Sequence, residues 1–120
     1  MLLNCFAVAC GGAVGCVLRY LVGLIPALQR GNLPVNTLIV NIAAAILIGM
    51  VVKWSGSHDM NPSTVLMLKV GFCGGLSTMS ALALESLGMF QNGQIAFGVG
   101  YIIVTVALCI GGVCLGQHIV

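Results

Sequence analysis

The stretch GFCGGLSTMSALALE (residues 71–85) places three glycines, two serines and a threonine inside a long apolar segment. A glycine pair followed by small hydroxyl residues is poor helix-forming sequence. In lipid, every backbone group that a helix break releases must find another partner. The stretch therefore predicts a membrane helix that is broken near its middle, with other polar groups close to the break.

The composition around this stretch is that of an integral membrane protein. The chain has 120 residues, of which 60% are hydrophobic and 5% charged, and its mean hydropathy is +1.18. Soluble domains contain about 25% charged residues. Because a spanning helix needs about 20 apolar residues, we expect one transmembrane domain over residues 1–120, with no separate soluble domain.

Prolines and polar segments divide the chain into apolar runs. Expected helices cover residues 2–25, 34–54, 62–90 and 94–118, and the connections PALQRGNL, KWSGSHDMNP and QNG are rich in helix breakers. The first run contains Arg19 and lacks a small-residue cleavage pattern, so we interpret it as a permanent span. The fold class predicted is all-α, a polytopic membrane protein with four transmembrane helices.

The basic residues give almost no preferred orientation. Arg30 lies in the first connection, whereas Lys53 and Lys69 flank the second, which faces the other side of the membrane. Basic loops favour the cytoplasmic side. Because the basic residues are distributed almost evenly between the two sides, we expect the chain to insert in both orientations. Symmetric assembly then predicts an antiparallel dimer. Lys53, Lys69 and Trp54 are expected to anchor the chain at the membrane interface.

Glycines four residues apart predict where helices approach one another closely. These pairs are Gly11 and Gly15, Gly71 and Gly75, and Gly112 and Gly116. The six cysteines lie in apolar runs without a CxxC pair or a histidine at ligand spacing, so we interpret them as packing residues. No phosphate loop, nucleophile elbow or catalytic triad pattern occurs in the sequence, and we expect no enzyme.

Polar side chains within the apolar runs are the candidate functional residues, because such groups are costly in lipid unless they have partners. Each polar stripe alone is also explained by an interhelical hydrogen bond worth about 0.6–2 kcal/mol. Three stripes in so short a chain favour a polar pathway instead. They comprise Thr37 and Asn41 in the second run, Ser77, Thr78 and Ser80 in the third, and Tyr101 and Thr105 in the fourth.

The chemistry of this set favours an anion. Hydroxyl and amide groups donate hydrogen bonds, and the only acids in the sequence are Asp59, in a connection, and Glu85. A conduit of donors without a ring of carboxylates suits an anion better than a cation. Carbonyl groups released by the break, conversely, need a donor or a bound cation.

Several segments carry a resemblance to a known family. With GGAVGCVLRY in the first run, NTLIVN in the second, GFCGGLSTMS in the third and a tyrosine four residues before a threonine in the fourth, the chain resembles the CrcB, or Fluc, fluoride-channel family over nearly its whole length. The resemblance implies an antiparallel dimer with two ion pathways, each lined by both subunits, which exports fluoride passively. The short chain favours a prokaryotic inner membrane.

The resemblance also implies roles for individual residues. Backbone carbonyls of Gly74 and Ser77 would hold a structural sodium ion between the subunits, and Arg19 matches the arginine of the family's first helix. Apart from the resemblance, Glu85 lies about eight residues beyond the break, and we expect it to support the site through an ion pair or a hydrogen bond. The implied partners are fluoride, sodium, membrane lipid, and either a second copy of the chain or a paralogous chain. We expect no nucleic-acid partner. The implied ion pathway comprises Thr37, Asn41, Met79, Ser80, Leu82, Tyr101 and Thr105.

One departure from the family leaves alternatives open. Met79 and Leu82 stand where the family has two phenylalanines whose electropositive ring edges face the anion. Either the chain conducts fluoride at an altered rate, or it pairs with a paralogous chain that supplies the aromatic residues. A small multidrug-resistance exporter of cations would share the length and four spans but needs a carboxylate deep in the first helix, where this sequence has none. A non-transporting membrane subunit would leave Asn41, Tyr101 and Thr105 without a purpose.

Overall fold

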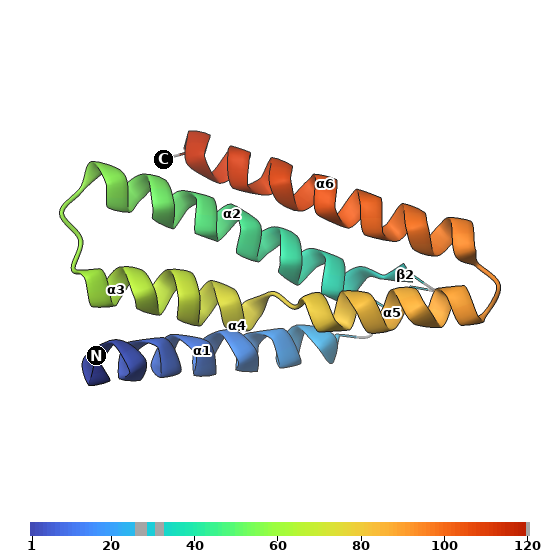
Figure 1. Cartoon of the computed structure of the whole chain (residues 1–120), viewed down its shortest axis with the longest axis horizontal. Helices are drawn as coiled ribbons and strands as arrows, with labels where there is room; N and C mark the ends of the chain where they lie inside the picture. The colour runs from blue at the N-terminus through green and yellow to red at the C-terminus, as the bar shows by residue number, and fades with distance from the viewer. Residues whose placement is uncertain (26–28, 31–32, 120) are drawn as a thin grey trace.

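The computed structural model describes residues 1–25, 29–30 and 33–119, and within them 4 helical spans are long and apolar enough to cross a membrane. The spans are Leu2–Gly23 (α1), Val35–Ser57 (α2), the segmented span Pro62–Gln91, and Ile95–Ile119 (α6). They run alternately up and down, so both termini lie at the same end of the bundle (Figure 1). The predicted all-α architecture with four spans is confirmed.

The helix ends differ from the predicted ones by up to three residues. Helix α1 ends at Gly23 rather than at residue 25, because Pro26 disfavours helical conformation at the residue before it. Helix α2 continues to Ser57 rather than residue 54. In its last turn, two serine hydroxyls donate back to helix carbonyls, Ser55 to Val52 at 3.0 Å and Ser57 to Lys53 at 2.9 Å.

The first and last connections have defined turn structures. Strands β1 (Gln29–Arg30) and β2 (Leu33–Pro34) form a short antiparallel ladder in the segment predicted to be a loop, and the ladder includes Pro34, which was predicted to begin the second helix. A ladder of two residues a side is too short to leave an alternating pattern in the sequence. Between the third span and α6, Gly93 has a φ of 81°, a left-handed conformation that glycine adopts without steric cost.

The third span is divided into four helical segments and is broken near its middle, as predicted. A short helix, α3 (Pro62–Leu66), leads into a π-helical segment, η2 (Met67–Cys73), and then into α4 (Gly74–Leu76) and α5 (Met79–Gln91). Ser77 and Thr78 are extended, with ψ angles of 159° and 120°. Gly74, which was expected at the break, is helical (φ −66°, ψ −33°); the break instead begins where a hydroxyl side chain caps the next helix.

Glycines bring the backbone of α1 against the third span. A methyl group added at Gly15 would overlap the carbonyl oxygen of Phe72, and one added at Gly75 would lie 2.8 Å from the carbonyl oxygen of Gly12. Gly11 and Gly71 make equally close approaches across the same pair of helices. The predicted close contact at these glycine spacings is therefore observed.

A second pair of helices, α2 and α6, packs in the same way. A methyl group at Gly116 would overlap the carbonyl oxygen of Ile46, and one at Gly49 would overlap that of Val113. A methyl group at Gly112 would lie 3.3 Å from the side chains of Ala45 and Ile46, which is closer than ordinary packing. The bundle thus consists of two tightly joined helix pairs, α1 with the third span and α2 with α6. The third span lies beside α2 where the two pairs meet (Figure 1).

Candidate functional site

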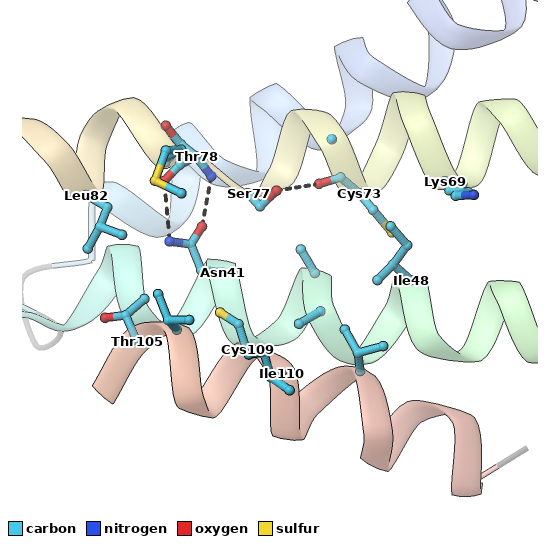
Figure 2. A pocket seen from close by; sticks show the side chains of 16 residues that line it. Asn41, Ile48, Lys69, Cys73, Ser77, Thr78, Leu82, Thr105, Cys109 and Ile110 are labelled. Carbon is cyan, nitrogen blue, oxygen red and sulfur yellow. Dashed lines mark hydrogen bonds between the residues drawn. The ribbon is translucent and has the colours of Figure 1, made fainter. Parts of the chain in front are cut away.

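Asn41 supplies the partner for the backbone at the break. Its Oδ1 accepts a hydrogen bond from the Thr78 backbone N–H at 2.8 Å, and its Nδ2 donates to the Thr78 carbonyl at 3.4 Å (Figure 2). In a continuous helix the Thr78 N–H would donate to the carbonyl of Gly74. Asn41 is only 8% exposed, so this side-chain amide replaces a helical hydrogen bond inside the protein.

Arg19 donates a hydrogen bond to a second backbone carbonyl that the break releases. Its Nε donates to the Gly75 carbonyl at 3.0 Å, an acceptor that would otherwise pair with the N–H of Met79. The guanidinium also lies at the carboxyl end of the first half of the third span, where a positive charge interacts favourably with the helix dipole. The half-buried Arg19 is thus held by the break rather than by a carboxylate.

Thr78 defines the start of α5. Its Oγ1 accepts from the N–H of Ala81 at 3.2 Å, which makes it the N-cap of this helix. In a continuous helix the N–H of Ala81 would donate to the carbonyl of Ser77, so this carbonyl loses its helical donor. The carbonyl of Gly74 loses its donor in the same way, because the N–H of Thr78 is bonded to Asn41. The two carbonyls expected to hold sodium are therefore the ones whose helical donors are redirected to side chains.

A cavity of about 400 Å³ lies beside the break, between α2, the third span and α6 (Figure 2). Both carbonyl residues, Gly74 and Ser77, line it, and its walls are mostly apolar. Thr105 is only 2% exposed, and its hydroxyl donates to the Tyr101 carbonyl at 2.7 Å, so its proton is committed to its own helix. The predicted pathway residues that line the cavity are Asn41, Met79, Leu82 and Thr105.

Met79 and Leu82, which replace the two expected aromatic residues, lie in different environments. Met79 is 72% exposed and lies on the outer surface of the chain. Leu82 is 5% exposed and packs in a cluster with Met89 and Tyr101, between α5 and α6. Of these two side chains, only Met79 is therefore accessible to a neighbouring molecule.

A second cavity, of about 410 Å³, lies on the side of the break that faces α1. Thr78 lines both cavities, so the break separates them. Arg19, Thr37 and Glu85 line this second cavity, together with Tyr20 and Asn36. The candidate residues therefore form two groups on opposite sides of the break rather than one continuous stripe.

Glu85 joins two of the predicted pathway residues. The Thr37 hydroxyl donates to Oε2 at 2.8 Å, and the Tyr101 hydroxyl donates to Oε1 at 3.1 Å. Both carboxylate oxygens of Glu85 therefore have neutral donors from other helices. Thr37 and Tyr101, which we expected to face an ion, direct their hydroxyl protons to this carboxylate in the single chain.

The remaining predicted residue, Ser80, lies at the exposed surface near the break. Its Oγ is 3.1 Å from Oγ1 of Thr78. Thr78 belongs to the polar stripe of the third run but not to the predicted ion pathway. Its position just before a helical run is an N-cap signal that would have identified it.

The chain matches the family described as CrcB-like protein, Camphor Resistance (CrcB), over residues 6–117. The chain belongs to the CrcB-like family. The match covers α2 and the third span completely, and α1 and α6 except for their outermost residues. The resemblance inferred from the sequence segments is confirmed.

Curated relatives cover nearly the whole chain. A protein of Ruminiclostridium cellulolyticum named "Fluoride-specific ion channel FluC" is 37% identical over 118 residues, which are 97% of this chain and 91% of the relative. Proteins with the same name from Shewanella halifaxensis (36% identical, 98% and 95% covered) and Clostridium perfringens (37% identical, 98% and 94% covered) are similarly close. The CrcB-like chain is thus a multi-pass protein of the prokaryotic cell membrane, with relatives named as channels rather than enzymes.

Proposed function

We propose that the chain is a passive, fluoride-selective ion channel that exports cytoplasmic fluoride and so protects the cell against fluoride toxicity. The observation that carries the proposal is family membership, with relatives named as fluoride-specific ion channels at 36–37% identity over nearly the full length. This membership favours a fluoride channel over the multidrug exporter of cations.

The donors at the break suit a small anion. Fluoride holds its hydration shell strongly, so a narrow path must replace water with hydrogen-bond donors. The Asn41 amide carries two N–H groups, and only one of them is directed to Thr78. The hydroxyls of Thr78 and Ser80 share one hydrogen bond, which leaves one of their two protons for an ion.

The direction of transport follows from electrostatics. Moving one charge through 100 mV changes its free energy by about 2.3 kcal/mol, and a membrane potential that is negative inside drives an anion outwards. Neutral hydrogen fluoride crosses lipid and dissociates in the less acidic cytoplasm. An open passive channel therefore lowers the cytoplasmic fluoride concentration without coupling to another solute.

We further infer that two copies assemble as an antiparallel dimer. In the single chain, Met79 and Ser80 are exposed beside the break, and a methyl group at Gly74 would meet nothing within 4 Å. Within the described chain, Gly74 therefore has no close neighbour that requires a glycine at this position. Close approach of a second copy would explain why the position is a glycine. The dimer also brings the exposed donors of one chain towards the cavity of the other.

The released carbonyls fit a structural sodium ion in this dimer. The carbonyl oxygens of Gly74 and Ser77 are hard ligands of the kind that alkali and alkaline-earth cations prefer. Each lacks its usual helical donor, and both residues line the same cavity. Two carbonyls from each of two copies would surround one cation on the symmetry axis and neutralise the dipoles that the break exposes.

Fluoride efflux from liposomes that contain only this chain tests the proposal. With a potassium ionophore present, we expect a fluoride electrode to record release well above that of protein-free liposomes, and little release of chloride under the same conditions. An intact dimer that releases no fluoride would contradict a channel made of this chain alone. Release that then requires a coexpressed paralogous chain would support the mixed assembly instead.

A further inference from the structure

One charged side chain lines the cavity beside the break. Among the described residues that form its wall, Lys69 is the only one with a charge, and none is a carboxylate. Lys69 belongs to the π-helical segment η2 and is exposed. Cationic side chains within membrane spans are costly, and they usually mark an ion or substrate path.

The Lys69 ammonium has no partner within the described parts of the chain, whereas two other cationic side chains do. Arg19 donates to the Gly75 carbonyl at 3.0 Å, and Lys53 donates to the Gln117 carbonyl at 3.4 Å. Lys53 thereby caps the end of α6. No hydrogen bond or ion pair to residues 1–25, 29–30 or 33–119 fixes the Lys69 side chain, so its full charge is available to a mobile anion.

Lys69 lies towards the end of the cavity that is nearer the chain termini. Lys69, Cys73 and Ser77 all line the cavity from the third span (Figure 2). Eight residues separate Lys69 from Ser77, which corresponds to about 12 Å along a helix. The charge is thus separated from the break, where the polar donors are. The hydrocarbon region extends about 15 Å to either side of its centre, so a break at the centre would place Lys69 close to the edge of this region.

We propose that Lys69 collects anions at the mouth of the pathway, an inference that rests on the proposed channel function. A cation in a cleft with apolar walls concentrates the electric field and raises the local concentration of small anions. Because the ammonium lies far from the break, it attracts hydrated fluoride without holding it where the ion must lose its water. This role replaces the expectation that Lys69 only anchors the chain at the membrane interface.

Fluoride efflux at two ionic strengths tests this role. The protein is reconstituted in neutral phosphatidylcholine liposomes with a potassium ionophore, and the ionic strength is set with an impermeant salt. Electrostatic attraction extends about 30 Å at 0.01 M and about 3 Å at 1 M. The variants are Lys69→Gln, Lys69→Glu and Lys69→Arg, with Lys53→Gln as the matched control at the same end of the bundle.

At about 0.01 M we expect Lys69→Gln to lower the initial rate roughly tenfold, the lower end of the range for electrostatic steering. Lys69→Glu should lower it further, Lys69→Arg should retain the wild-type rate, and Lys53→Gln should leave it unchanged. At about 1 M the rates of the four variants should converge on that of the wild type. Gel filtration of each variant in detergent verifies that the assembly is intact.

Two results would overturn the inference while leaving the channel function in place. One is a wild-type rate for Lys69→Gln at low ionic strength. The other is the same fractional loss at both ionic strengths, which would indicate a structural role for the side chain. A wild-type chain that releases no fluoride would instead overturn the proposed function, and the role of Lys69 with it.

Discussion

At the scale of single residues, the break depends on side chains that take over backbone hydrogen bonds. Asn41 pairs with both backbone groups of Thr78, and Arg19 pairs with the carbonyl of Gly75. A buried backbone group left without a partner costs about 1–3 kcal/mol. The residues at the site therefore serve both the stability of the fold and its chemistry.

Substituting Asn41 tests this dual role. Asn41→Ala removes both hydrogen bonds to Thr78 and should lower the free energy of unfolding by about 2–4 kcal/mol, because two part-buried backbone groups lose this partner. It should also abolish fluoride efflux. Thermal unfolding in detergent and electrode measurements check the two effects. Asn92→Ala, at the exposed turn after α5, is the control; equal losses in both variants would contradict the assignment.

The hydrogen bonds of Glu85 predict energetic coupling. Thr37→Val and Tyr101→Phe each remove one donor to the carboxylate, and each should destabilise the protein by about 1–3 kcal/mol. In a Glu85→Leu background the same substitutions should cost much less, because the acceptor is gone. A double-mutant cycle measured by thermal unfolding should give coupling energies of about 0.5–3 kcal/mol. Strictly additive effects would show that these contacts contribute nothing.

At the scale of elements, the two helix pairs are joined by backbone contact at glycines. The close approach of α1 to the third span holds Arg19 near the released carbonyl of Gly75. The pairing of α2 with α6 supports Asn41 from the other side of the break. The break is thus positioned by two rigid pairs of helices and not by the flexibility of its own residues.

Alanine substitutions at glycines distinguish these contacts from unused positions. Gly15→Ala places a methyl group against the Phe72 carbonyl, whereas Gly111→Ala meets nothing within 4 Å. Gly15→Ala should lower the unfolding temperature and reduce fluoride efflux, since overpacking costs about 1–3 kcal/mol. Gly111→Ala should be neutral, or stabilising by up to about 1 kcal/mol. Similar unfolding temperatures for the two variants would contradict the packing.

At the scale of the whole molecule, one chain presents an incomplete site. Met79 lies 72% exposed beside the break, and the carbonyls of Gly74 and Ser77 lack their helical donors. Both termini lie at one end of the bundle (Figure 1), so the position of the C-terminus reports the orientation of the entire chain. An antiparallel dimer requires copies in both orientations.

Reporter fusions at the C-terminus test this requirement. Because the basic residues are so evenly distributed between the two sides, we expect a cytoplasmic reporter and a periplasmic reporter both to be active. Adding two lysines after the last helix should shift nearly all chains to one orientation and reduce fluoride efflux. Activity of only one reporter for the unmodified chain would contradict dual insertion.

The sequence alone determined the membrane class, the number of spans and the family, because these depend on apolar length, helix breakers and local motifs, which are properties of consecutive residues. It also located the break to within a few residues, from the glycines and hydroxyls of residues 71–85. Only the tertiary structure decided that Asn41 pairs with Thr78, that Thr37 and Tyr101 donate to Glu85, and that the polar residues form two groups. These pairings join residues 16 to 48 positions apart. They are selected by which helices pack together, and local patterns such as the glycine spacings do not specify the partner helix.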